Sequence, residues 1–210
     1  MTIEIPKPKS RNIYFPHQFD QINVNDVTKS IIDIQESDKL IRKISSINNM
    51  KYKPEPIKIY IDSYGGNVYQ CMGLISLIDS YRNDKKILSK GNQQQLQNGQ
   101  EINLNTEIHT ICTGAAMSCG FMLLISGHKR FCYENSTAMY HTVANMTGGK
   151  IQELEDDIEE TRRLQKIIEK IVLSKTLITK ERLRTVYKEK YDWFINSEEC
   201  LKLGVVDEII

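Results

Sequence analysis

The amino-acid sequence predicts one α/β domain whose strands are mainly parallel. A strand-like segment, a turn of glycine or other small residues and an apolar helical segment follow one another, and this unit occurs twice in succession. In the last third of the chain, a long amphipathic segment adds a helix with one apolar stripe to bury. Consecutive βα units place their strands in parallel within one sheet. With 210 residues, of which 40% are hydrophobic, the chain can bury a single sizeable core.

The N-terminal part predicts one strand and one helix. We interpret residues 1–10 as a short polar leader and residues 11–15 as the first strand. Residues 24–47 alternate polar and apolar side chains at roughly helical spacing. Pro54 and Pro56 then close this segment, because proline lacks the N–H that a helix interior needs.

The first βα unit follows directly. Ile57, Ile59 and Ile61 alternate with polar or amphipathic residues at period two, which predicts a strand. The run Asp-Ser-Tyr-Gly-Gly at residues 62–66 breaks that strand, and residues 68–81 return to helical periodicity.

The second unit is built from smaller residues. Residues 107–113 are rich in β-branched side chains and predict a strand, residues 114–116 (Gly-Ala-Ala) predict a tight turn, and residues 118–126 are apolar enough for a buried helix. Two short strands are expected at residues 130–132 and 138–141.

The C-terminal part is mainly helical. Apolar residues recur at three- and four-residue steps across 150–176, which predicts the long amphipathic helix. Thr179 is placed to cap a further helix, and Ser197 to cap a short one that ends at Gly204.

Residues 91–105 are rich in Gln and Asn and contain little to bury. We interpret this stretch as an exposed loop inserted between a helix and the next strand, since loops accept added length at small entropic cost. A regulatory or partner-binding role for it is the alternative.

Charge and composition exclude several function classes. The chain carries 28 basic and 27 acidic residues, so no global field favours nucleic acid or an anionic membrane. No stretch reaches the roughly 20 apolar residues that span a bilayer, and the N-terminus lacks the apolar part of a signal peptide.

The five cysteines form no metal-binding pattern. They form no CxxC pair, and most lie in apolar or small-residue runs, which is typical of reduced core residues. We therefore expect a cytoplasmic protein in a reducing compartment, without a metal. The cysteines are Cys71, Cys112, Cys119, Cys132 and Cys200.

Ser118 is the candidate nucleophile. It lies where a strand turns into a helix, so its alternative role is that of a helix N-cap. The small residues around it leave room for a substrate to approach. At such a turn the N–H of Cys119 is free to bind an oxyanion, and Gly66 can direct a second N–H into the same site.

A serine needs a base within hydrogen-bond reach. Of the four histidines, only His141 ends a strand-like run near a turn, whereas His17 and His128 lie in polar, loop-like segments. His109, on the strand before Ser118, is the alternative base.

Asp192 is the candidate partner of that base. It lies within Tyr-Asp-Trp-Phe, the densest aromatic cluster of the chain. An ionised carboxylate in such surroundings needs a partner, and an imidazole N–H would serve. An aspartate at a helix end or turn is the alternative.

Five separated segments, in the same order, resemble motifs of the Clp protease proteolytic subunits. The resemblance runs from about Arg11 to the C-terminus, at similar spacing except for the Gln/Asn-rich insertion. The segments are residues 59–66 (IYIDSYGG against YINSPGG), 110–124 (TICTGAAMSCGFMLL against TICxGxAxSMGAFLL), 129–141 (KRFCYENSTAMYH against KRFxxPNSxxMIH), 192–199 (DWFINSEE against DRFxSAxEA) and 204–209 (GVVDEI against GLVDxI).

This resemblance implies a ClpP/crotonase-type spiral of βαβ units in a single domain over residues 1–210, with 150–176 as the handle helix. It also implies a serine endopeptidase with Ser118, His141 and Asp192 as catalytic triad. The members form an oligomeric chamber of heptameric rings that stack through the handle and hydrolyse peptides or unfolded proteins without a cofactor.

The chain departs from the family pattern at the site. Tyr64 replaces the proline of SPGG, Cys119 replaces a methionine, and Thr142-Val143 replaces Gln-Pro. These changes predict a reshaped substrate groove. The resemblance implies an AAA+ unfoldase as partner. About ten residues precede the first strand, where the family usually has a pore loop and a helix that contact the unfoldase, and this difference puts that partner in doubt. The shortened form is similar to divergent members carried by bacteriophages.

Two alternatives to the peptidase are consistent with the same fold. A catalytically silent ring or scaffold subunit would keep the assembly without hydrolysis. A crotonase-type acyl-CoA enzyme would use two backbone N–H groups and no serine nucleophile.

Overall fold

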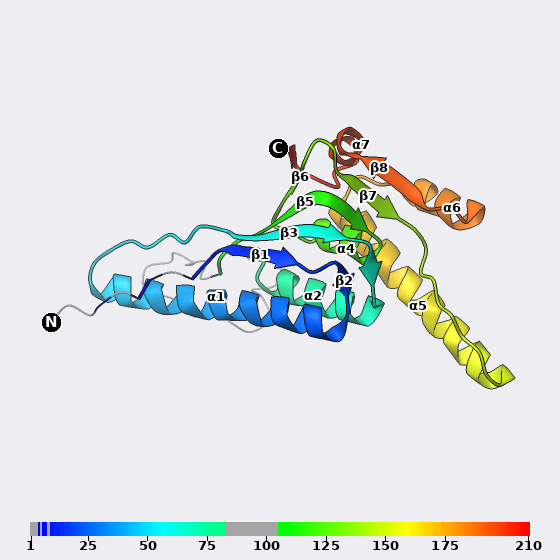
Figure 1. Ribbon diagram of the computed structural model, residues 1–210, viewed down its shortest axis with the longest axis horizontal. Coiled ribbons are helices and arrows are strands. Elements are labelled where there is room, and N and C mark those ends of the chain that lie inside the picture. Colours follow the sequence, from blue (N-terminus) through cyan, green and yellow to red (C-terminus); the bar gives the residue numbers. More distant parts are fainter. Residues whose placement is uncertain (1–3, 5, 8, 83–104) are drawn as a thin grey trace.

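The computed structural model describes residues 4, 6–7, 9–82 and 105–210 and shows an α/β fold around a seven-stranded sheet (Figure 1). The strand order is β1-β3-β5-β6-β9, with β7 paired to β5 and β8 paired to β7. Every pair is parallel except β7–β8. The predicted fold class is confirmed. The strands of this sheet are β1 (Asn12–Phe15), β3 (Ile57–Ser63), β5 (Ile108–Met117), β6 (Lys129–Cys132), β7 (Thr137–Tyr140), β8 (Trp193–Asn196) and β9 (Glu208–Ile209).

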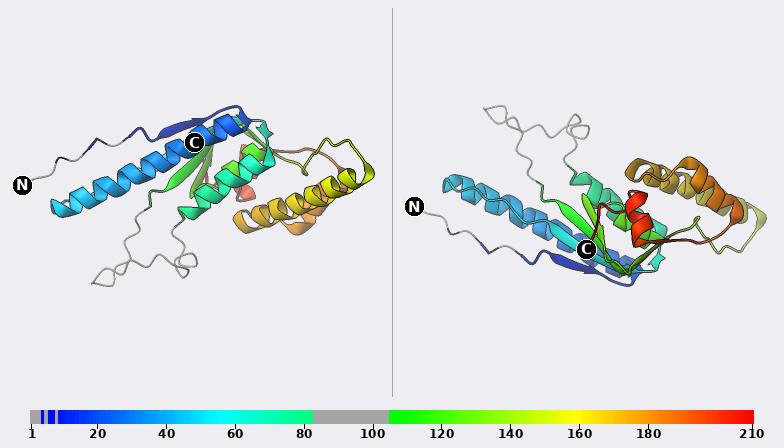
Figure 2. Two further views of the ribbon diagram at one scale, coloured as in Figure 1. Left: turned by 90° about the horizontal axis from the view of Figure 1, so that it is seen from below. Right: turned by 90° about the horizontal axis from the view of Figure 1, so that it is seen from above.

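The helices surround this sheet. Helices α1 and α2 lie side by side against it, while α5 extends away from the rest of the molecule (Figures 1 and 2). The short helix α4 is buried along its whole length. The helices are α1 (Gln21–Ile47), α2 (Val68–Ser80), α4 (Cys119–Leu124), α5 (Ile151–Lys175), α6 (Lys180–Glu189) and α7 (Ser197–Lys202).

Period-two alternation places the central strand β3. Ile57, Ile59 and Ile61 are fully buried, whereas the residues between them face the other side of the sheet. Since successive side chains of a strand point to opposite faces, these isoleucines form one wall of the core. A second, two-stranded sheet of β2 (Gln18–Phe19) and β4 (Gly65–Gly66) continues beyond the end of β3.

The tight turn predicted at residues 114–116 is wrong, because strand β5 continues through them to Met117. Along this stretch β5 leaves β6 and pairs with β7 instead. A Cβ at Gly114 would lie 2.8 Å from Asp62 Oδ1, and the Ala115 N–H donates to the same oxygen at 2.9 Å. The small residues therefore allow close approach of β3 within the sheet.

One of the two predicted C-terminal caps is confirmed, and the other differs by one residue. The Thr179 side chain accepts from the Arg182 N–H and caps α6, as expected. Asn196, and not Ser197, caps α7 by accepting from the Glu199 N–H at 2.9 Å. The Ser197 hydroxyl instead donates to the Glu134 carbonyl at 2.6 Å, because that oxygen lies within its reach across the fold.

A buried ion pair ties the first strand to α1. Asp38 is fully buried and accepts from the Arg11 guanidinium at 2.5 and 2.7 Å. The hydroxyls of Thr106 and Tyr52 complete the set at 2.6 and 3.1 Å. Burial raises the pKa of Asp38, but these hydrogen bonds, led by the one from Arg11, outweigh burial and leave the pKa below its ordinary value.

The cysteines lie where the sequence analysis expects them. All five cysteines are unpaired and buried, which confirms them as core residues. No helix within the described part of the chain is long and apolar enough to cross a membrane. The insertion predicted at residues 91–105 lies outside the described residues except for Asn105, and so does part of the leader.

Candidate active site

A cavity of about 160 Å³ brings together residues from four separate elements. Gly66, Ser118, Cys119 and His141 all line it. Ser118 follows β5, His141 follows β7 and Gly66 lies in β4, just beyond β3. The three strands β3, β5 and β7 are parallel neighbours, so their carboxyl ends meet at one edge of the sheet.

Ser118 has an unusual backbone. Its φ of 53° and ψ of −115° lie outside the ordinary regions for a residue with a side chain, a conformation that costs about 1–3 kcal/mol. The Ser118 N–H donates to the Met139 carbonyl at 2.9 Å, which fixes the serine beside β7. Although Ser118 occupies the N-cap position of α4, its side chain makes no capping hydrogen bond. The hydroxyl is therefore not used as a cap.

Gly65 makes room for the serine. Its φ is +106°, and a Cβ built there would lie 2.7 Å from the Ser118 Cβ and 3.1 Å from the Cys119 nitrogen. No side chain fits in that space. The β4 segment can therefore pass directly over the start of α4 only with glycine at this position.

Gly66 presents its polar backbone to the cavity side. The Asn67 N–H donates to the Phe19 carbonyl of β2 at 2.8 Å. Successive residues of a paired strand direct their N–H groups to opposite edges, so the N–H of Gly66 points away from β2. Its carbonyl faces α4, since the Cys119 Sγ donates to it at 3.3 Å.

Cys119 supplies a second free N–H. It is the first residue of α4, and the first N–H groups of a helix have no acceptor within the helix. Gly66 and Cys119 thus line the same cavity as Ser118.

His141 and Asp192 flank the only antiparallel pair of the described sheet. His141 follows β7 and Asp192 precedes β8, and Tyr140 is paired with Trp193. The His141 Nδ1 lies 3.9 Å from the Asp192 Oδ1. This separation is longer than a hydrogen bond. Among the described residues, no hydrogen bond joins the Ser118 hydroxyl to His141.

The prediction that aromatic residues surround the Asp192 carboxylate is wrong. Its side chain is 57% exposed, although Trp193 beside it is buried. Because side chains alternate along β8, Trp193 and Ile195 face inward whereas Phe194 faces solvent, and the aromatic run does not bury the carboxylate.

The other histidines considered lie away from the cavity. His109 contacts the Glu107 carboxylate at 3.1 Å. The His128 Nδ1 accepts from the Ile108 N–H at 2.7 Å, and burial lowers the pKa of this imidazole to about 4. Neither residue lines the cavity, so His141 is the histidine that the fold brings to Ser118.

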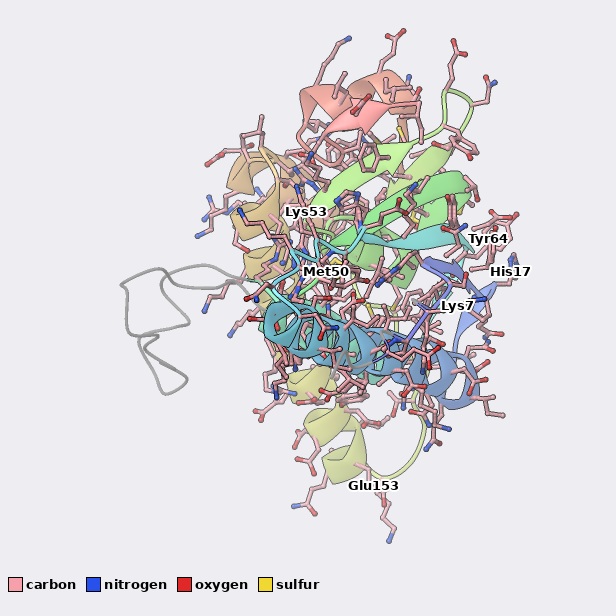
Figure 3. The ribbon with its side chains drawn as sticks, turned by 90° about the vertical axis from the view of Figure 1, so that its left-hand side faces the viewer. Lys7, His17, Met50, Lys53, Tyr64 and Glu153 are labelled. Atoms are coloured by element: carbon pink, nitrogen blue, oxygen red, sulfur yellow. The ribbon has the colours of Figure 1, made fainter. Side chains whose placement is uncertain are left out.

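Tyr64, which replaces a proline in the motif, turns outward. Its ring is 61% exposed and packs edge-on against His17, with 4.6 Å between ring centres (Figure 3). The other three replaced residues, Cys119, Thr142 and Val143, all line the cavity.

Sequence reasoning missed Gln165, which holds the segment after His141 in place. Gln165 is 8% exposed, and its side-chain oxygen accepts from the Val143 N–H at 2.9 Å. Its nitrogen reaches Tyr140 and Glu169. The only signal in the sequence is a polar residue on the apolar stripe of α5.

The walls of the cavity are mainly apolar. Among the residues that the structure describes, no group of three or more histidine, cysteine or acidic side chains is placed to hold a metal ion. The cavity is therefore suited to an uncharged side chain next to a polar reacting group. The apolar wall residues are Val68, Met72, Met122, Val143, Ala144 and Ile168.

Comparison with known proteins gives one consistent result. The family model described as Clp protease matches residues 101–210, just over half of the chain. An ATP-dependent Clp protease proteolytic subunit of Deinococcus radiodurans is 28% identical over 181 residues, which cover 85% of this chain and 76% of that protein. An ATP-dependent Clp protease proteolytic subunit 2 of Frankia casuarinae is 24% identical over 204 residues, which cover 96% of this chain and 76% of that protein.

Proposed function

The chain belongs to the Clp protease family, and we propose that it is a serine endopeptidase in which Ser118 is the nucleophile, His141 the general base and Asp192 the group that orients the base. The observation that carries this proposal is the shared cavity of Ser118, His141, Gly66 and Cys119.

The reaction proceeds through an acyl-enzyme. His141 accepts the hydroxyl proton of Ser118 while the oxygen attacks the carbonyl carbon of the peptide bond. The N–H groups of Gly66 and Cys119 hold the oxyanion that forms. Each such donor is typically worth roughly 3 kcal/mol of transition-state stabilisation. His141 then gives its proton to the leaving amine, and water releases the acyl group by the reverse sequence.

The 3.9 Å separation of His141 and Asp192 and the missing hydrogen bond between Ser118 and His141 in the described structure are compatible with this mechanism. Hydrogen bonds between catalytic groups are often long without substrate and shorten in the bound complex. His141 is only 25% exposed and follows a short strand, so a small shift of its segment brings the imidazole toward both partners.

Assembly into an oligomer is part of the same proposal. The first half of α5 stands away from the sheet, and Glu153 near its start lies at one end of the molecule (Figures 1 and 3). Ile151 and Ile158 on this half are 76% and 47% exposed. We expect copies of the chain to bury these residues, in stacked heptameric rings that enclose a peptide or unfolded substrate.

One observation favours a second candidate, a catalytically silent ring subunit. The Ser118 hydroxyl and His141 share no hydrogen bond in the described structure, and Asp192 is more than half exposed. A silent subunit would assemble but would not hydrolyse peptides.

Replacement of the serine separates the two candidates. Ser118→Ala is expected to abolish hydrolysis of short fluorogenic peptides and labelling by a fluorophosphonate, because it removes the attacking oxygen. The matched control is Ser76→Ala, which replaces an exposed serine on α2 and should leave peptide hydrolysis and fluorophosphonate labelling unchanged. Unchanged turnover in Ser118→Ala, or no turnover in the unaltered protein as an intact oligomer, contradicts the peptidase proposal.

A further inference from the structure

The cavity contains two thiols that peptide hydrolysis does not use. Cys71 of α2 and Cys119 of α4 both line it, together with Ser118 and His141. The Cys71 Sγ donates to the Cys119 carbonyl at 3.6 Å, and the Cys119 Sγ donates to the Gly66 carbonyl at 3.3 Å. The two sulfur atoms thus lie at the junction of α2, α4 and β4.

The other cysteines provide a contrast. Cys112 and Cys132 are direct cross-strand partners in β5 and β6, so they too are close together. All four of these thiols are only 1–3% exposed, but Cys112 and Cys132 do not line the cavity. Within the described residues, only Cys71 and Cys119 combine closeness with an open space that a small reagent can enter.

The two thiols differ in reactivity. Burial raises the pKa of Cys71, whereas the neighbouring Cys71 thiol lowers the pKa of Cys119. The thiolate is the form that attacks an oxidant. Cys119 is therefore the thiol that reacts first, and Cys71 is placed to react second.

We propose that Cys119 and Cys71 form an oxidisable thiol site inside the cavity, with hydrogen peroxide as the oxidant. The Cys119 sulfur attacks one peroxide oxygen, the O–O bond breaks, and the product is a sulfenic acid and one water. The Cys71 sulfur then attacks the Cys119 sulfur, the S–O bond breaks, and a disulfide and a second water result. Two thiols lose two electrons in total, and one peroxide gains them.

The effect on hydrolysis rests on the proposed function. A disulfide imposes a fixed length and torsion on the two sulfur atoms and removes the hydrogen bond from the Cys119 Sγ to the Gly66 carbonyl, so we expect it to draw Cys119 away from Gly66. The N–H of Cys119 moves with it. Loss of one oxyanion donor lowers turnover on the order of 10²–10³-fold, which is the expected fall on oxidation. Dithiothreitol should restore it.

The test is to treat the whole protein with hydrogen peroxide and to map its disulfides by mass spectrometry of unreduced peptides. We expect a link between Cys71 and Cys119, while Cys112 and Cys132 remain thiols in the same sample. In Cys71→Ala, the sulfenic acid has no partner, so dimedone should label Cys119. Mapping of the unaltered protein stands by itself if this variant does not fold.

The outcomes separate the two proposals. Peptide hydrolysis without a Cys71–Cys119 link after oxidation overturns the thiol site alone. An equal or faster link between Cys112 and Cys132 overturns it as well, because the cavity then has no role. A Cys71–Cys119 link in a protein that never hydrolyses peptides supports the thiol site and contradicts the peptidase.

Discussion

Gly65 is the residue on which the geometry of the site depends most directly. Its positive φ and its contact with Ser118 both require the absence of a side chain. Gly120 also allows close packing, since a Cβ there would lie 2.9 Å from the Ser63 carbonyl. Ser118 itself keeps a strained backbone because β7 and β4 hold it from two sides.

We expect Gly65→Ala to lower both stability and turnover. The added methyl meets the Ser118 Cβ at 2.7 Å and adopts a φ that alanine disfavours, which together should cost about 1–3 kcal/mol or more of unfolding free energy. Denaturant titration and peptide turnover are the measurements.

Gly73→Ala is the matched control. This glycine lies within α2 with nothing within 4 Å of a built Cβ. Alanine there should stabilise the protein by roughly 0.5–1 kcal/mol, because glycine loses more backbone entropy in a helix. Equal effects of the two substitutions contradict the close approach at Gly65.

At the scale of elements, helix α5 is connected to the site through Gln165. The side chain joins the helix to Val143, two residues beyond His141. It acts as a positioning residue, since it does not line the cavity itself.

Gln165→Leu should lower kcat by more than it raises KM. The Val143 N–H loses its acceptor, and because this donor is only partly buried, the cost should lie near or below about 1 kcal/mol, the lower end for a buried donor. Gln165→Glu keeps an acceptor oxygen and should recover part of the kcat. Gln152→Leu, an exposed substitution on the same helix, should change neither value. A pure loss of stability without a change in kcat contradicts the positioning role.

The ion pair between Arg11, just before β1, and Asp38 of α1 predicts a pH dependence of stability. The pKa of Asp38 is lower in the folded protein than its ordinary value of 3.8, so this group contributes stability above that pH. The contribution is lost as pH falls through the folded pKa. Unfolding free energy measured by denaturant from pH 7 to pH 2 should therefore fall below about pH 4.

Two variants identify the group responsible. Asp38→Asn should lose stability at pH 7, because it leaves Arg11 without its buried partner, and should flatten the decline at acid pH. Asp33→Asn alters an exposed pair with Lys9 and should keep the decline. A decline of equal size in Asp38→Asn assigns the effect to other carboxylates.

At the scale of the whole molecule, the first half of α5 exposes Ile151 and Ile158, which we expect a second copy of the chain to bury. We expect Ile158→Glu to lower the particle mass measured by light scattering, because it places a charge in the expected interface. Tyr187→Glu changes an exposed apolar residue on α6 and should keep the mass. A monomeric unaltered protein contradicts the assembly proposal.

Much of the fold could be predicted from local patterns. The period-two isoleucines of β3 and the three- and four-residue steps of α5 each identify an element without reference to the rest of the chain. Errors arose where a local pattern has two causes. Small residues at 114–116 signal either a turn or close packing, and only the position of Asp62 decides between them.

For the candidate site, too, local sequence predicts some features and only the tertiary structure decides others. The sequence by itself determined the helices, most of the sheet strands, their order and the residues whose type suits nucleophile, base and oxyanion donor, because these depend on neighbours along the chain; it did not predict β2, β4, β8 or β9. Only the tertiary structure decided that Asp192 is exposed, that Gln165 holds the His141 segment and that Cys71 lies beside Cys119. Burial, distance and partner choice are set by residues far apart in sequence, and folding alone brings them together.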